Sequence, residues 1–126
     1  MKNETAQNTP LTTKNGYYYG TTLGRSWWRR YTHDGLLARG TADIIVDRTG
    51  VRFRRYLESE ERLVPLYGIT EVSIGKFHAG KWTGAPIIKV VWIKGGEELV
   101  SGFTVSWKKD VTEQWVNALN GFRNKK

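Results

Sequence analysis

The amino-acid sequence predicts a mainly β fold: a bent antiparallel sheet or barrel of six to seven strands, capped by one C-terminal α-helix. Two observations lead to this prediction. From residue 38 onward, short segments alternate apolar and polar residues, which is the period of half-buried strands, and turn residues separate them. Residues 110–122 instead place apolar residues at helical spacing. A helix this short is unstable alone, so we expect it to pack on an open end or face of the sheet.

The length and composition predict one modest domain. Residues 1–15 have almost nothing to bury and predict a disordered leader, and we place a single domain at residues 16–126. The chain has no cysteine. This excludes disulfides, thiolate nucleophiles and sulfur-ligated metals.

The charge favours an anionic partner. Twenty Lys and Arg against twelve Asp and Glu give a formal net charge of +8, which suits phospholipid headgroups or nucleic acid. The alternative is a soluble basic protein without such a partner. No apolar run approaches the roughly 20 residues of a spanning helix, and no signal-peptide pattern follows the start. We expect a cytoplasmic protein, either free or peripheral to a membrane.

Two aromatic clusters, residues 17–19 and 27–31, precede the regular strands. They are consistent with an extra edge strand or with a short helix, and the sequence does not choose between them.

Residues 42–55 predict a β-hairpin, because two alternating segments flank the turn sequence Asp-Arg-Thr-Gly. Closing the hairpin at this turn places Ile44 opposite Phe53 on the buried face. The same register places Asp43 opposite Arg54 on the other face.

The later segments predict further strands. Residues 62–66 form a short strand at an edge or bend, because Pro65 has no amide donor. Residues 70–74 alternate again. Residues 87–93 and 98–107 form a second long hairpin. Its apolar residues stand at both odd and even positions, which indicates a strand covered on two sides or bent at Gly102.

Residues 75–86 carry three glycines and a proline and predict the longest loop of the folded part. Such loops often carry function.

The C-terminal helix has a predicted start, stop and buried face. Asp110 and Glu113 form a capping box, and Gly121 supplies the stop. The apolar face consists of Val111, Trp115, Ala118, Leu119 and Phe122. We assign Trp92, Trp107 and Trp115 to the core, because each follows the period of its segment.

The order of these elements resembles the pleckstrin-homology (PH) superfold, most closely its bacterial PH-like and GRAM-like members. The resemblance rests on the glycine-bounded hairpin of residues 40–53, the Val-Pro-Leu-Tyr-Gly-Ile-Thr-Glu-Val segment at 64–72, and the helix with Trp115. It implies a bent sheet or barrel closed at one end by the helix. Members of this superfold bind phosphoinositides, peptides or other proteins, so the fold alone sets no function.

The first hairpin carries one group of candidate ligand-binding residues: Arg48, Arg52 and Arg54. Arg39, a twelve-residue spacer and Arg52-Phe53-Arg54 match the spacing of the phosphoinositide signature of PH domains. However, Arg39 lies about 20 Å along its strand from the position opposite Arg52, too far for one headgroup. Arg48 and Arg52 form a tighter pair. The alternative is a solvated basic face that discourages edge pairing.

The predicted loop carries a second group: Lys76, Phe77, His78, Lys81 and Trp82. Cations interleaved with aromatic rings suit a membrane surface or a nucleic acid. The alternative is that Phe77 and Trp82 anchor the loop on the sheet. A secondary surface consists of Trp27, Trp28, Arg29 and Arg30.

The sequence has no phosphate-binding glycine loop, metal-ligand cluster or serine nucleophile elbow, so we expect neither an enzyme nor a cofactor. The function we predict is a non-catalytic PH/GRAM-like binding module, which engages a protein partner or an anionic membrane surface through the basic hairpin and residues 75–86. The runner-up is a nucleic-acid-binding β-barrel. A third option is a self-associating structural domain, and the oligomeric state stays open.

Overall fold

The computed structural model describes residues 10–23, 40–55, 61–78 and 81–124; at residues 14, 15, 40, 55, 76–78 and 81–83 only the backbone is described. The strands are β1 (Leu11–Leu23), β2 (Gly40–Asp47), β3 (Gly50–Arg55), β4 (Arg62–Pro65), β5 (Ile69–His78), β6 (Lys81–Lys94) and β7 (Glu97–Thr104). A 3-10 turn, η1 (Leu66–Gly68), links β4 to β5, and the helix α2 (Lys109–Arg123) follows β7.

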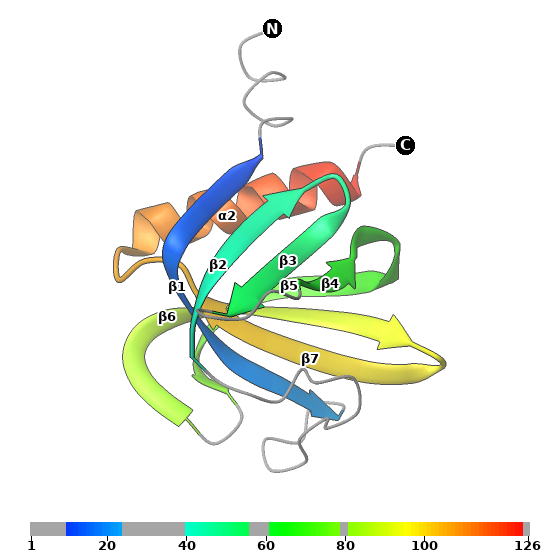
Figure 1. Ribbon diagram of the computed structural model, residues 1–126, viewed down its shortest axis with the longest axis horizontal. Coiled ribbons are helices and arrows are strands. Elements are labelled where there is room, and N and C mark those ends of the chain that lie inside the picture. Colours follow the sequence, from blue (N-terminus) through cyan, green and yellow to red (C-terminus); the bar gives the residue numbers. More distant parts are fainter. Residues whose placement is uncertain (1–9, 24–39, 56–60, 79–80, 125–126) are drawn as a thin grey trace, which may run out of the picture.

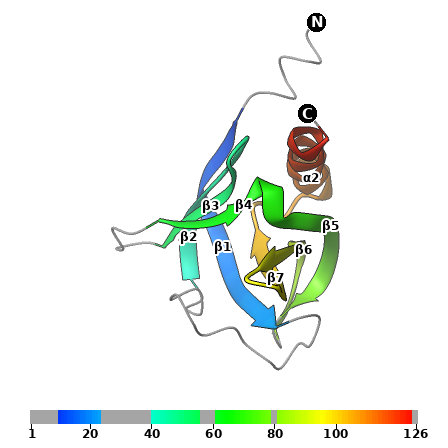
Figure 2. The same ribbon diagram turned by 90° about the vertical axis from the view of Figure 1, so that its right-hand side faces the viewer.

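The strands of the described part form one antiparallel seven-stranded sheet in the order β4-β3-β2-β1-β7-β6-β5 (Figure 1). Figure 2 shows β2 and β3 on one side of the molecule and β5 and β6 on the other, with α2 above the opening between them. The helix contacts β2, β5, β6 and η1. The prediction of a mainly β, bent sheet of six to seven strands capped by one C-terminal helix is confirmed.

The strand β1 corrects two predictions. Tyr17 lies opposite both Thr41 of β2 and Thr104 of β7, so the first aromatic cluster belongs to the centre of the sheet and not to an edge strand or short helix. The leader prediction is wrong for residues 11–15, because β1 begins at Leu11 opposite Val46. Its polar residues misled the prediction, since their backbone groups are stabilised by pairing with β2. Residues 1–9 and the second cluster, 27–31, lie outside the described residues.

The core fills the space between the two halves of the sheet and the helix. Phe53 of β3 lies at its centre, with ring centroids 4.7 Å from Tyr18 of β1 and 5.2 Å from Phe103 of β7. Trp115 and Leu119 of α2 belong to the same buried cluster. One apolar core thus connects both halves of the sheet to the helix.

The first hairpin has the predicted register. Ile44 lies opposite Phe53 in the core, and Asp43 lies opposite Arg54. The expectation for Pro65 is also confirmed, because β4 is an edge strand of the described sheet.

The prediction of a loop at residues 75–86 is wrong. The strand β5 continues to His78 and β6 begins at Lys81, with Phe77 opposite Trp82. The glycines and the proline that suggested a loop are accommodated within the strands. The register shifts between Gly75 and Phe77, and Gly84 adopts a positive φ of 84°.

The predicted hairpin of residues 87–93 and 98–107 is present as β6 and β7, and it turns at Gly95 and Gly96. Trp92 is buried, but Trp107 is 74% exposed, so its assignment to the core is wrong. The reason is that β7 ends at Thr104, and the strand alternation does not extend to Trp107.

The helix buries its predicted face but has different ends. The cap residue is Lys108, without a side-chain cap bond, and the Asp110 carboxylate accepts a hydrogen bond from the Val111 amide. The prediction of a capping box is therefore wrong. The helix also runs through Gly121 to Arg123, so Gly121 is not a stop. Packing of Leu119 and Phe122 in the core outweighs the local preference of glycine.

We expect Trp115→Ala to lower the free energy of unfolding by about 3–5 kcal/mol, because it empties a large buried aromatic site. A domain of this size would be largely unfolded by that loss. Chemical denaturation measures the change, and Gln114→Ala, at an exposed neighbouring position, is the control. An unchanged midpoint for Trp115→Ala would show that the helix does not stabilise the sheet.

A second expectation concerns Gly50, which has a φ of 130° and lies so close to β4 that an added Cβ would meet the Val64 carbonyl oxygen and, at 2.7 Å, the Leu66 nitrogen. Gly50→Ala should destabilise the protein by about 3 kcal/mol or more, from the backbone conformation and the overlap together. Gly95 also has a positive φ, 58°, with nothing within 4 Å. Gly95→Ala should therefore cost only about 1–2 kcal/mol. Equal effects in denaturation curves would refute the contact with β4.

Candidate binding surface

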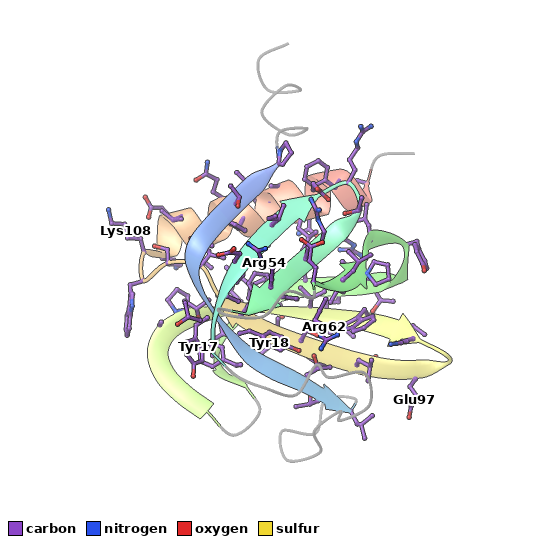
Figure 3. The ribbon with its side chains drawn as sticks, in the orientation of Figure 1. Tyr17, Tyr18, Arg54, Arg62, Glu97 and Lys108 are labelled. Carbon is purple, nitrogen blue, oxygen red and sulfur yellow. The ribbon has the colours of Figure 1, made fainter. Side chains whose placement is uncertain are left out.

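The outer face of the first hairpin is balanced in charge. Arg54 donates a hydrogen bond of 2.9 Å to Asp43 across the ladder, and Figure 3 shows Arg54 on this face. Arg52 forms an ion pair with Asp47 and lies 3.7 Å from Glu61. These two arginines, predicted as ligand-binding residues, thus meet two carboxylates of β2 and one that lies just before β4.

The third predicted arginine, Arg48, lies in the turn between β2 and β3 and is exposed. The turn is fixed by Asp47, whose carboxylate accepts hydrogen bonds from the Thr49 amide (2.9 Å) and hydroxyl (2.5 Å). Burial alone would raise the pKa of Asp47, but these hydrogen bonds and the Arg52 guanidinium outweigh it and lower the pKa below its ordinary value of 3.8. Asp47 therefore stays ionised at neutral pH and holds the turn that carries Arg48.

Two open grooves meet at Arg48 and Tyr67. The first, which we call the β4 groove, has a volume of about 570 Å³ and lies between β4, η1 and the end of β6. The second, the α2 groove, has a volume of about 410 Å³ and lies between η1 and the C-terminal end of α2. Both volumes fall in the range of ligand pockets, about 300–1,000 Å³. On the right of Figure 1, the β2–β3 turn, η1 and the end of α2 lie close together, with the β6–β7 turn below them.

The grooves combine exposed apolar surface with positive charge. Tyr67 is 93% exposed, and Leu63 and Ile93 in the β4 groove are 43% and 40% exposed. Lys94 lines the β4 groove, Arg123 lines the α2 groove, and Arg48 lines both. Among the described residues, no carboxylate lines either groove. Exposed apolar residues that gather within a basic rim are typical of a recognition site for an acidic partner.

Arg123 is held in place at the α2 groove. Its guanidinium donates hydrogen bonds to the Asn120 side chain (2.7 Å) and to the Thr70 carbonyl of β5 (3.0 Å). These bonds tie the end of the helix to the edge of the sheet. A cation at a helix C-terminus is also favoured by the helix dipole.

Of the ligand-binding residues predicted from sequence, Arg48 alone lies in these grooves as far as the structure describes the chain. The backbones of residues 76–78 and 81–82 form the paired ends of β5 and β6, but the side chains of Lys76, Phe77, His78, Lys81 and Trp82 lie outside the described part. Arg39 and the secondary surface of Trp27, Trp28, Arg29 and Arg30 lie wholly outside it. Ligand binding by these residues stays a prediction.

Sequence reasoning missed five residues that give the grooves their exposed apolar surface and charge, namely Leu63, Tyr67, Ile93, Lys94 and Arg123. They come from four separate segments, so no local pattern connects them. One signal was available at Tyr67. This residue interrupts the alternation after Pro65 and is followed by Gly68, which indicates a turn carrying an exposed aromatic residue.

Within the ranges that the structure describes, His, Asp and Glu do not gather in any group of three or more that could hold a metal ion. No helix in the same ranges is long and apolar enough to cross a membrane.

The lowered pKa of Asp47 predicts a pH-dependent contribution to stability. Because the folded-state pKa lies below the unfolded one, the contribution is present above about pH 4 and is lost as the pH falls through the folded-state pKa. Asp47→Asn should thus lower the unfolding free energy at pH 7 by up to about 1 kcal/mol. The difference from the unmodified protein should shrink toward pH 3. Urea titrations across this range test it, and a constant difference would contradict it.

Comparison with known proteins agrees with this architecture. A family model described as "Bacterial PH domain-like" matches residues 2–120. No curated protein matches the chain. The match covers nearly the whole chain, and the bent sheet closed by α2 is the fold that the resemblance implies. The chain therefore belongs to the bacterial PH domain-like family.

Proposed function

We propose that the chain is a non-catalytic binding module that engages a protein partner through the surface around Arg48 and Tyr67. One observation carries the proposal: the described residues that expose apolar side chains at this end of the molecule surround two grooves lined by cations and by no carboxylate. The PH-like fold supports a binding role in general, because domains of this family are mostly non-catalytic. We place the protein in the cytoplasm as part of the same proposal.

A protein partner fits this surface better than a lipid headgroup. Phosphate recognition relies on cations that are available to the ligand, whereas Arg52 and Arg54 are occupied by Asp43, Asp47 and Glu61. The grooves instead offer exposed Tyr67 and aliphatic side chains, which is the composition of protein interfaces. The net charge of +8 adds long-range attraction for an acidic partner.

The test starts from random twelve-residue peptides displayed on phage and selected on the unmodified protein. Peptides that bind it should lose at least tenfold in affinity on Tyr67→Ser, since this change removes the most exposed apolar side chain of both grooves. Trp107→Ser is the matched control. Trp107 is also an exposed aromatic residue, but Lys108 beside it lies at the opposite end of the molecule from Glu97 at the β6–β7 turn (Figure 3).

Vesicles provide the second arm of the test. We expect equal, weak binding to phosphatidylcholine vesicles with and without phosphatidylglycerol at physiological salt. Strong binding to the anionic vesicles that Arg48→Glu abolishes would instead favour the anionic membrane surface.

Peptide affinities unaffected by Tyr67→Ser would refute this surface as the site. Salt-dependent binding of an oligonucleotide, or a dimeric mass in solution that Tyr67→Ser reduces to that of a monomer, would favour the nucleic-acid and self-association alternatives.

A further inference from the structure

We propose that the β4 groove binds an extended, acidic segment of a protein partner, and that this segment adds a strand to the edge of β4 that no other described strand covers. This inference rests on the proposed function and goes further, because it names the conformation and the charge of what is bound.

The register determines which backbone groups of β4 point toward β3 and which point away from it. In an antiparallel pair, opposed residues alternate between pairs that exchange hydrogen bonds and pairs whose backbone groups point away. The Leu66 amide donates to the Thr49 carbonyl (3.0 Å), so Leu66 and Thr49 form a bonded pair. Val51 and Val64, two positions along the ladder, are therefore bonded as well, and Leu63, opposite Arg52, points its amide and carbonyl away from β3.

This outward side of β4 is an edge of the described sheet. Leu63 and Pro65, whose backbone groups face outward, are also the two β4 residues that line the β4 groove. Backbone groups that point away from β3 thus lie beside an apolar groove. A strand laid in the groove would receive backbone hydrogen bonds from the edge and place alternate side chains against Leu63 and Ile93.

The edge admits only a short strand. Pro65 has no amide hydrogen, so the outward side of β4 offers one donor, the Leu63 amide, and two acceptors, the carbonyls of Leu63 and Pro65. Backbone bonds alone would bind weakly here. Side-chain contacts in the groove must therefore provide much of the affinity and the specificity.

The charge of the groove selects the partner. Arg48 and Lys94 line it, and no carboxylate among the described residues does. A second copy of this chain pairing edge to edge would bring two such basic rims together, which repels. An acidic segment instead places a carboxylate against Arg48 and its apolar residues against the groove. The partner we infer is a protein segment with Asp or Glu next to aliphatic residues.

The experiment compares two substitutions at Leu63, using the peptides selected on the unmodified protein. Leu63→Ala removes the side chain but keeps the amide, whereas Leu63→Pro removes the outward amide at an edge position where proline is tolerated. We expect Leu63→Pro to bind at least tenfold more weakly than Leu63→Ala. We also expect the selected peptides to be enriched in Asp and Glu, and Arg48→Glu to prefer the same peptides with Lys in place of those residues.

Amide NMR on the unmodified protein gives a readout that does not depend on how the variants fold. Peptide binding should shift the Leu63 amide downfield and slow its hydrogen exchange. Unchanged Leu63 exchange, equal affinities of Leu63→Pro and Leu63→Ala, or selected peptides without acidic residues would overturn the inference. If Tyr67→Ser weakens binding while the two Leu63 variants bind equally, the inference fails and the proposed function stands. If Tyr67→Ser has no effect, the proposed function fails as well.

Discussion

The pairing of β1 with both β2 and β7 is the constraint on which the rest of the structure depends. This strand joins two meanders, β1 to β4 and β5 to β7, into one sheet. Buried side-chain bonds reinforce the junction: the Thr21 hydroxyl of β1 bonds Ser101 of β7 at 2.7 Å, and the Trp92 indole of β6 donates to the same Ser101 oxygen at 3.0 Å. Since an unpaired buried hydroxyl is unfavourable, this network specifies how the strands align.

The bend at β1 also determines where the candidate site lies. A sheet folded into two halves leaves one end open, and α2 closes it with Trp115, Leu119 and Phe122 in the core. The end of the helix then meets η1 and β5, where Arg123 bonds the Thr70 carbonyl. The α2 groove lies where the closing helix meets η1. Figure 2 shows how α2 and the two halves of the sheet are arranged.

The features that could be predicted from the sequence are the local ones. The register of Asp43 with Arg54 follows from one turn and two short alternating segments. The position of β1 could not be predicted, because Tyr17 pairs with Thr104, far away in the sequence. The candidate site was predictable only at Arg48, since its other residues converge through tertiary packing. The prediction that Trp107 is buried failed for a related reason. The end of a strand is determined by the neighbouring strands and not by the period of its own sequence.

The same residue type acts differently at different places on the hairpin. Within β3, Arg54 has a position directly across the ladder, and Asp43 occupies it. A turn residue has no such cross-strand position, so Arg48 lies at the end of the ladder, where η1 brings Tyr67 beside it. The sheet thereby neutralises the arginines along its face, and a cation at its turn lines the grooves together with apolar surface. Recognition at such chain reversals is common, because a rigid sheet holds them in place while their side chains stay accessible.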